Sequence, residues 1–243
     1  MFKIGLKLWS TNTDCYLHEA ERLYADGVFD YLEIYFVPGS LECVRQWRST
    51  GIACIVHAPH SAHGVNLASA DAEQHNIAVF EDVRRFADAL SAEAIIVHGG
   101  VLGSVDETIR QLKLVGDGRI LIENKPYLPV DGTQRRLAGS TSMEISRITA
   151  ELGCGFCLDI GHAVASANAH GEDWRVVLDA FLTLSPKMFH VSDIDTGSRV
   201  DQHLHFGCGN LPVGEILGKL PADSPLSIET VKDSRTELED FRK

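Results

Sequence analysis

The chain has 243 residues, 44% of them hydrophobic and 23% charged, which suits a globular protein with one large buried core. It contains no apolar run near the ~20 residues of a membrane-spanning helix, and it begins without the long apolar segment of a signal peptide. These features argue against a membrane protein and predict a cytoplasmic location. The formal net charge of −12 disfavours a phosphate-rich partner unless bound cations offset it.

The six cysteines are predicted to be reduced thiols, as is usual in a cytoplasmic chain. Cys154 and Cys157 have the C-x-x-C spacing, but no second pair follows at the distance of a zinc ribbon. They lead directly into an apolar strand, so we predict two buried thiols.

Eight short apolar segments, rich in Ile, Val, Leu or Phe, recur along the whole chain. Such segments are typical of parallel strands that are buried on both faces. We predict strands at Lys3–Leu8, Tyr31–Phe36, Ala53–His57, Ala94–His98, Arg119–Glu123, Phe156–Asp159, Lys187–Val191 and Leu226–Thr230.

Helical segments alternate with these strands. They are predicted at 14–27, 40–50, 71–90, 104–115, 142–152, 173–184, 212–219 and 234–242. Three of them begin with the Ser/Thr-x-x-Glu pattern of a capping box, at Ser104, Thr141 and Ser234. Eight strand–helix alternations without a linker predict one α/β domain over residues 1–243, a single (β/α)₈ TIM barrel. The last helix is short, so either an imperfect closure or a partner subunit would seal the barrel.

Metal-binding side chains stand where these strands are predicted to end, or in the loops that follow. They are His57, His98, Glu123, Asp159, His162, His190, Asp201, His203 and Glu229. The loops at this end of a (β/α)₈ barrel carry the active site. The carboxylates would repel one another, and no Lys or Arg occupies these strand ends, so we expect the balancing cations to come from outside the chain. The ligand types favour Zn²⁺, with Mn²⁺ or Fe as alternatives.

Individual residues differ in what their positions imply. Glu123 and Glu229 end apolar strands, where a carboxylate has no structural use, so both are predicted to be functional. His60 lies in the same loop as His57 and is a second candidate for the ligand from that loop. The remaining histidines are predicted to be structural: His18, His63, His75, His170 and His205.

Four sequence elements resemble, in chain order, the endonuclease IV branch (AP endonuclease family 2) of the xylose-isomerase-like barrel superfamily. They are Val-His-Ala-Pro with Val-Asn-Leu-Ala-Ser at 56–59 and 65–69, Leu-Asp-Ile-Gly-His at 158–162, Gly-Ser-Arg-Val-Asp-x-His at 197–203, and Gly-x-Gly-Asn at 207–210. The resemblance implies up to three metal ions. The first would be held by His57, His98 and Glu123, the second by Glu123, Asp159, His190 and Glu229, and the third by His162, Asp201 and His203. Sugar isomerases and epimerases of the superfamily use only the Glu123, Asp159, His190 and Glu229 set.

Several metal ions at one site can clamp a phosphate group and activate water. We therefore predict hydrolysis of a phosphate ester or phosphodiester, with Glu123 and Glu229 as catalytic residues and Glu123 holding the attacking hydroxide. Arg199, His60 and Lys125 are the candidates for substrate binding; an ion pair of Arg199 with Asp193 or Asp195 is an equal alternative.

Two other functions remain open. A sugar or sugar-phosphate isomerase or epimerase would use Glu123 and Glu229 to move protons on either side of a carbonyl, with one metal ion polarising the substrate. A non-catalytic, metal-stabilised binding module is the other. The ligand types also permit an iron-dependent oxidation, as a more distant option.

The loops at 37–40 and 59–64 contain no Arg, Lys or aromatic residue, whereas DNA enzymes of this branch use such residues to enter DNA at an abasic site. Duplex binding also needs Lys and Arg to replace counterions, and the chain has 22 of these against 34 acidic residues. We expect a phosphorylated small molecule or single-stranded nucleic acid as substrate, or at most weak activity on duplex DNA with an abasic site. The oligomeric state stays open.

Overall fold

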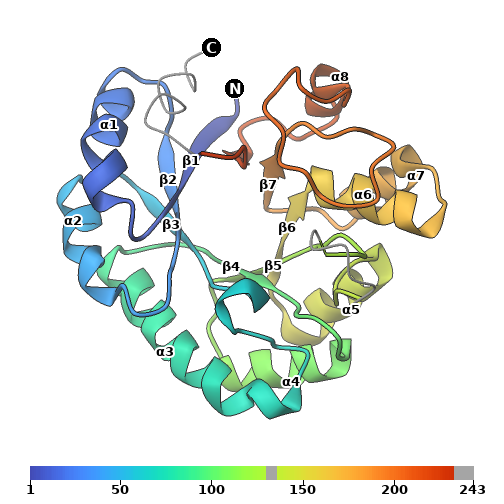
Figure 1. Cartoon of the computed structure of the whole chain (residues 1–243), viewed down its shortest axis with the longest axis horizontal. Helices are drawn as coiled ribbons and strands as arrows, with labels where there is room; N and C mark the ends of the chain where they lie inside the picture. The colour runs from blue at the N-terminus through green and yellow to red at the C-terminus, as the bar shows by residue number, and fades with distance from the viewer. Residues whose placement is uncertain (130–135, 233–243) are drawn as a thin grey trace.

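The computed structural model describes residues 1–129 and 136–232. Eight parallel strands form a closed barrel in sequence order, with β8 paired to β1 (Figure 1). The strands are β1 (Lys3–Trp9), β2 (Tyr31–Tyr35), β3 (Cys54–His57), β4 (Ile95–His98), β5 (Ile120–Glu123), β6 (Gly155–Asp159), β7 (Met188–Val191) and β8 (Pro225–Ile228). The predicted (β/α)₈ TIM barrel is confirmed, and the barrel closes within the chain.

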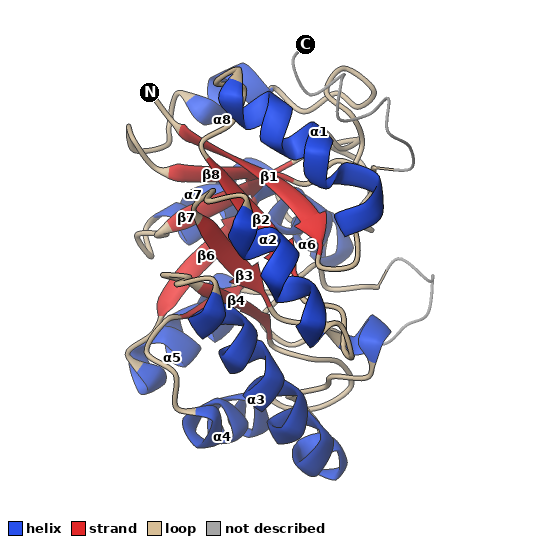
Figure 2. Ribbon diagram, turned by 90° about the vertical axis from the view of Figure 1, so that its left-hand side faces the viewer, coloured by secondary structure: helices blue, strands red, loops and turns tan. Residues whose placement is uncertain are grey.

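Helices surround the strands and cover their outer faces (Figures 1 and 2). They are α1 (Thr13–Ala25), α2 (Val44–Ser49), α3 (Glu73–Ala89), α4 (Val105–Val115), α5 (Ser142–Leu152), α6 (Ile160–His170), α7 (Trp174–Leu182) and α8 (Val213–Leu217). The hydroxyls of Ser104 and Thr141 cap α4 and α5, accepting hydrogen bonds from the backbone N–H groups of Glu107 and Glu144. The predicted capping box is only half formed at Ser104, because its N–H donates to the Ala68 carbonyl instead of to Glu107. The helix predicted at 234–242, with Ser234, lies outside the described residues.

Two segment predictions need correction. No helix is predicted where α6 lies, because residues 160–167 are apolar or small apart from His162 and are all buried, so they show no amphipathic pattern. Strand β8 ends at Ile228, so Glu229 follows the strand instead of lying inside it. The Glu229 N–H still donates to the Val191 carbonyl at 3.0 Å, which holds its side chain at the barrel end.

The interior of the barrel is filled by inward-pointing side chains. Ile96, Cys157 and Met188 form a small apolar cluster there. Gly5 faces the Tyr31 ring so closely that a Cβ at this position would lie 2.4 Å from the ring. The Tyr31 hydroxyl reaches Ser227 at 2.9 Å, so the floor below the polar strand ends is closed by side chains.

Cys157 is buried and Cys154 partly buried, and all six cysteines are free thiols, as the sequence predicts. Among the described residues, no helix has the length and apolarity to cross a bilayer.

Candidate metal centre

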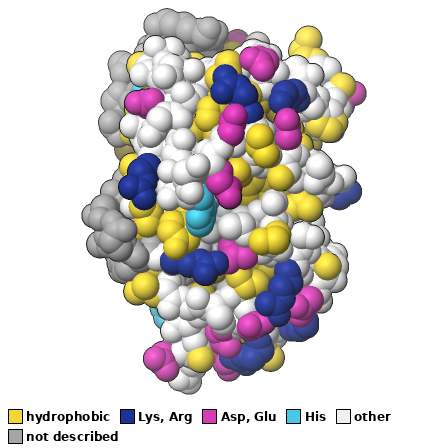
Figure 3. Space-filling model, turned by 90° about the vertical axis from the view of Figure 1, so that its right-hand side faces the viewer, with side chains coloured by type: hydrophobic (Ala, Val, Ile, Leu, Met, Phe, Trp, Pro, Cys, Tyr) yellow, Lys and Arg dark blue, Asp and Glu magenta, His cyan; other side chains and the backbone are white. Residues whose placement is uncertain are grey.

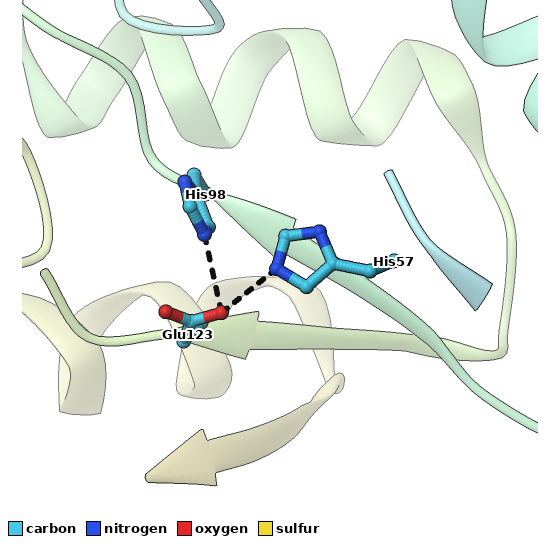
Figure 4. Close-up of side chains that lie close together, drawn as sticks. All are labelled: His57, His98 and Glu123. Carbon is cyan, nitrogen blue, oxygen red and sulfur yellow. Dashed lines mark hydrogen bonds and ion pairs between the residues drawn. The ribbon is translucent and has the colours of Figure 1, made fainter. Parts of the chain in front are cut away.

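The first ligand group joins three neighbouring strands at their carboxyl ends. His57 ends β3, His98 ends β4 and Glu123 ends β5, and pairing of the strands places His98 directly opposite Glu123. Both imidazole Nε2 atoms lie 3.1 Å from Glu123 Oε2, and Figure 4 shows the two rings turned toward this oxygen. Glu123 is fully buried.

The protonation of His57 shows that this group suits a cation. The ring donates its Nδ1–H to the Ala58 carbonyl at 2.8 Å, so Nε2 carries a lone pair toward Glu123. Burial lowers the pKa of His57 to about 4, which keeps the ring neutral near pH 7. A lone pair facing a carboxylate oxygen is repulsive unless a cation lies between them. Ligand atoms on a tetrahedral zinc ion are about 3.3 Å apart, close to the spacing found here.

The second group takes Glu123 together with Asp159 from the end of β6 and His190 from β7. Asn124 connects these strand ends, because its side chain accepts the Asp159 N–H at 2.8 Å and donates to the Asp159 carbonyl at 2.9 Å. Glu229 lies beside this group, with its Oε1 2.9 Å from His190 Nδ1, and it also forms a further possible ligand group with Glu33 and His57. His190 Nδ1 is buried without a hydrogen-bond partner in the described part of the chain, an arrangement that suits a metal ligand.

The third group consists of His162, Asp201 and His203. Asp159 caps α6 by accepting the His162 N–H at 2.7 Å, so the turn from β6 into α6 carries His162 toward the strand ends. His162 donates Nδ1–H to the Asn124 carbonyl at 2.9 Å, which leaves Nε2 facing Asp201 Oδ2 at 3.4 Å. His203 Nε2 lies 2.5 Å from the same oxygen. Its backbone has φ 47°, the strained left-handed conformation that often occurs at functional sites.

This third group attracts positive charge. Burial opposes protonation of His162, but the carboxylates of Asp159 and Asp201 outweigh it and raise the pKa of His162 to about 10. Burial also opposes ionisation of Asp201, and His203 and His162 outweigh it, so the pKa of Asp201 lies well below its ordinary value.

Two lysines enter the centre, so the expectation that all balancing cations come from outside the chain is wrong. Lys125 Nζ lies 3.4 Å from Glu123 Oε1 and 3.2 Å from His162 Nε2. Lys7, which points inward from β1, forms ion pairs with Glu229 and with Glu33. Lys7 was missed because it lies inside a strand, two residues before its end.

Glu33 is a fifth carboxylate that the sequence analysis missed. It lies within β2 and is fully buried, and its Oε2 accepts from His190 Nε2 at 2.9 Å. Burial opposes its ionisation, but His190 and Lys7 hold the pKa of Glu33 well below its ordinary value. A glutamate between Leu32 and Ile34 in an apolar strand is the signal that could have revealed it.

The three candidates for substrate binding lie at different places. Lys125 is inside the centre, as described above. His60 stacks on the His98 ring, with centroids 4.7 Å apart, and belongs to none of the ligand groups, whereas His57 does. Arg199 is exposed on the loop after β7 and donates to the Ala169 carbonyl at 3.4 Å. No acidic side chain in the described ranges pairs with Arg199, so the alternative of a pair with Asp193 or Asp195 does not hold.

Aromatic rings border the centre on the side of β1 to β3. Trp9, at the end of β1, is 50% exposed, and its ring centroid lies 5.8 Å from those of Tyr35 and His63. Tyr35 in turn lies 5.2 Å from the first-group ligand His57. The sequence predictions missed this aromatic wall because they considered aromatic residues only in the loops at 37–40 and 59–64, whereas Trp9 and Tyr35 end β1 and β2.

Comparison with known proteins agrees with the barrel fold. A family model described as a xylose isomerase-like TIM barrel matches residues 27–243. The protein named "Probable endonuclease 4" of Mycobacterium ulcerans (strain Agy99) is 27% identical over 216 residues, covering 82% of this chain and 81% of that protein. Endonuclease IV from Thermus thermophilus superposes with a TM-score of 0.72 at 24% identity, covering 99% of this chain and 97% of that one. A D-tagatose 3-epimerase-like protein superposes with a TM-score of 0.72 at 22% identity, covering 99% and 95%. The two structural matches support the fold alone, and the family match shows that this chain belongs to the xylose isomerase-like TIM barrel family.

Proposed function

We propose that the protein is a metal-dependent hydrolase, with Zn²⁺ as the preferred ion, that acts on a small phosphate ester or phosphodiester. The observation that carries the proposal is the assembly of three ligand groups around Glu123. The first and third groups add His57, His98, His162, Asp201 and His203 to the second. An isomerase that uses the second group alone gives these five side chains no shared task. Similarity to a protein named for endonuclease activity supports the same choice.

Bound ions would supply Lewis-acid chemistry, which polarises a phosphate and makes water more acidic. Glu123 belongs to the first two groups at once, so with ions bound its carboxylate would help to hold the attacking water. Glu229 lies between His190 of the second group and His203 of the third, with its Oε2 3.6 Å from His203 Nδ1. Lys125 faces both the first and the third group and is placed to bind phosphate oxygens.

The distribution of basic residues favours a small substrate. Most described arginines form ion pairs with acidic side chains on the helices: Arg22, Arg84, Arg85, Arg110, Arg119, Arg136 and Arg147. Figure 3 shows one face of the molecule, where basic and acidic side chains alternate instead of forming a basic patch. Duplex binding depends on several unpaired Lys and Arg contacts to phosphates. Near the ligand groups, Lys125 is already paired with Glu123 and Arg199 is exposed on the loop after β7, and two such side chains are too few to bind a duplex.

Elemental analysis and kinetics together test the proposal. Protein purified without chelators should contain more than one equivalent of transition metal per chain. With zinc, it should hydrolyse bis(p-nitrophenyl) phosphate, and incision of an abasic-site duplex should be weak at both low and high salt. Glu123→Gln should abolish turnover while the fold, measured by circular dichroism, stays intact. Glu93→Gln makes the same charge change at an exposed position away from the ligand groups and serves as the control.

Several outcomes would contradict the proposal. Near-normal hydrolysis by Glu123→Gln, or metal content near zero, would refute the metal-dependent mechanism. Efficient and strongly salt-dependent incision at the abasic site would instead make DNA the substrate.

A second candidate, a sugar isomerase or epimerase, is favoured by the charges of the centre. Five carboxylates, from Glu33, Glu123, Asp159, Asp201 and Glu229, face the two ammonium groups of Lys7 and Lys125, a formal excess of three negative charges. One divalent ion nearly balances this excess, whereas three would overcompensate it. Exchange of a sugar C–H proton with solvent, together with one metal ion per chain, would establish this function.

A further inference from the structure

Four ionisable side chains from the first two and last two strands form a closed ring inside the barrel, here called the inner ring. Lys7 on β1 forms ion pairs with Glu33 on β2, at 3.0 Å, and with Glu229 after β8. His190 on β7 closes the ring, because Nε2 lies 2.9 Å from Glu33 Oε2 and Nδ1 lies 2.9 Å from Glu229 Oε1. Glu33 and His190 are fully buried.

We propose that Glu33 is a positioning residue for the metal centre: it fixes His190 in the tautomer that offers Nδ1 to a metal ion. Lys7 is the built-in cation that allows this carboxylate to be buried. The inference concerns metal binding by the second ligand group and holds for either proposed function.

The tautomer follows from the hydrogen-bond partners of His190. An ionised carboxylate only accepts, so the 2.9 Å contact with Glu33 places the ring proton on Nε2. Nδ1 then carries the lone pair, and its neighbours are acceptors: Glu229 Oε1 at 2.9 Å and Glu123 Oε2 at 3.5 Å. The Nδ1 lone pair and these two carboxylate oxygens therefore lie close together, an arrangement that suits a bound cation. The opposite tautomer would leave Glu33 facing a lone pair.

Lys7 explains why the carboxylate tolerates full burial. An isolated buried charge is strongly destabilising, and Lys7 offsets it from the side opposite His190. The same ammonium pairs with Glu229 Oε1, so it orients the second-group carboxylate as well. Carboxylates that hold a ligating histidine in this way typically contribute about 10–100-fold to metal affinity.

The first test replaces Glu33 by glutamine in chelator-stripped protein. Lys7 will attract the amide oxygen, so the amide NH₂ faces His190 and favours a proton on Nδ1. Zinc affinity, measured by competition with a chelating dye, should fall roughly 10- to 100-fold. Histidine side-chain NMR should show His190 with its proton moved from Nε2 to Nδ1. Affinity within twofold of the wild type, with an unchanged tautomer, would overturn the proposal.

A double variant separates positioning from charge balance. Lys7→Met with Glu33→Met keeps the net charge and approximate volume but leaves His190 Nε2 without an acceptor. If Glu33 positions His190, the zinc affinity of the double variant should stay at least tenfold below that of the wild type. Recovery of the affinity to the wild-type value would show that Glu33 only neutralises Lys7. Glu93→Gln controls for a general effect, and near-ultraviolet circular dichroism identifies variants that fail to fold. No substrate is used, so failure of the proposed hydrolase activity would leave this result unaffected.

Discussion

Replacing Lys125 by methionine is expected to tighten zinc binding at least tenfold. Lys125 Nζ lies 3.4 Å from His98 Nε2 and 3.2 Å from His162 Nε2, which belong to the first and third ligand groups. An ammonium this close to both groups repels any divalent ion that either group binds. Methionine keeps most of the length of the side chain and removes the charge.

The magnitude follows from these distances. A zinc ion about 2.1 Å from either imidazole nitrogen would lie within about 5.5 Å of the ammonium. The repulsion between charges of +1 and +2 at that distance is about 1.5 kcal/mol in bulk water, and about four times larger at an effective dielectric constant of 20. Because about 1.4 kcal/mol corresponds to a tenfold change in affinity, the lower value already predicts a tenfold effect.

Titration of chelator-stripped protein with Zn²⁺ measures this effect directly. Lys187→Met is the matched control, because Lys187 is exposed and precedes β7 at the opposite end of the barrel from the ligands. The control should bind zinc with wild-type affinity. Unchanged or weaker binding by Lys125→Met would show that its ammonium does not oppose the ions, and would refute the electrostatic reasoning.

Trp9→Ala should raise KM for bis(p-nitrophenyl) phosphate about 2- to 10-fold, since an aromatic contact contributes about 0.5–1.5 kcal/mol, and should leave kcat nearly unchanged. The metal-free protein should lose stability as pH rises. Protonated His162 has a pKa of about 10 in the folded protein and near 6.5 in the unfolded chain, so its stabilising contribution is complete below pH 6.5 and disappears as the pH passes about 10. The thermal unfolding temperature of the wild type should therefore be lower at pH 9.5 than at pH 6.5. The difference should be smaller in His162→Gln. Gly5→Ala should lower the free energy of unfolding by roughly 1–3 kcal/mol, measured by urea denaturation, because its Cβ would overlap the Tyr31 ring.

The strand order and the convergence of the candidate ligands at the strand ends could be predicted from local sequence patterns. The division of these ligands into three groups came from the family resemblance. A segment such as Ile-Ile-Val-His at 95–98 shows a buried strand and its polar end together. In a parallel barrel all such ends converge, so no knowledge of exact packing is needed to bring His98 near Glu123. The distances then follow from strand pairing.

The inner ring and α6 could not be predicted in this way. Whether Lys7 and Glu33 point into the barrel or toward the helices depends on register, and a shift of one residue reverses the direction of every side chain in a strand. Helix α6 follows β6 without a connecting loop, and its residues 160–167 are all buried, so this part lacks the polar face that marks a surface helix. The inner ring is a consequence of barrel closure, which no local pattern records.

Barrel closure and assembly of the metal centre are therefore linked events. Lys7 and Glu229 are 222 residues apart in sequence and meet only when β8 pairs with β1. His190 acquires its Glu33 partner only when β2 and β7 face each other across the closed barrel. A metal ion that binds Glu123, His190 and Glu229 thus binds the closed barrel in preference to the open chain. When the free ion concentration is 100 times the dissociation constant, binding stabilises the fold by about 2.7 kcal/mol. The pairing of β1 with β8 is the part of the fold that it stabilises most directly.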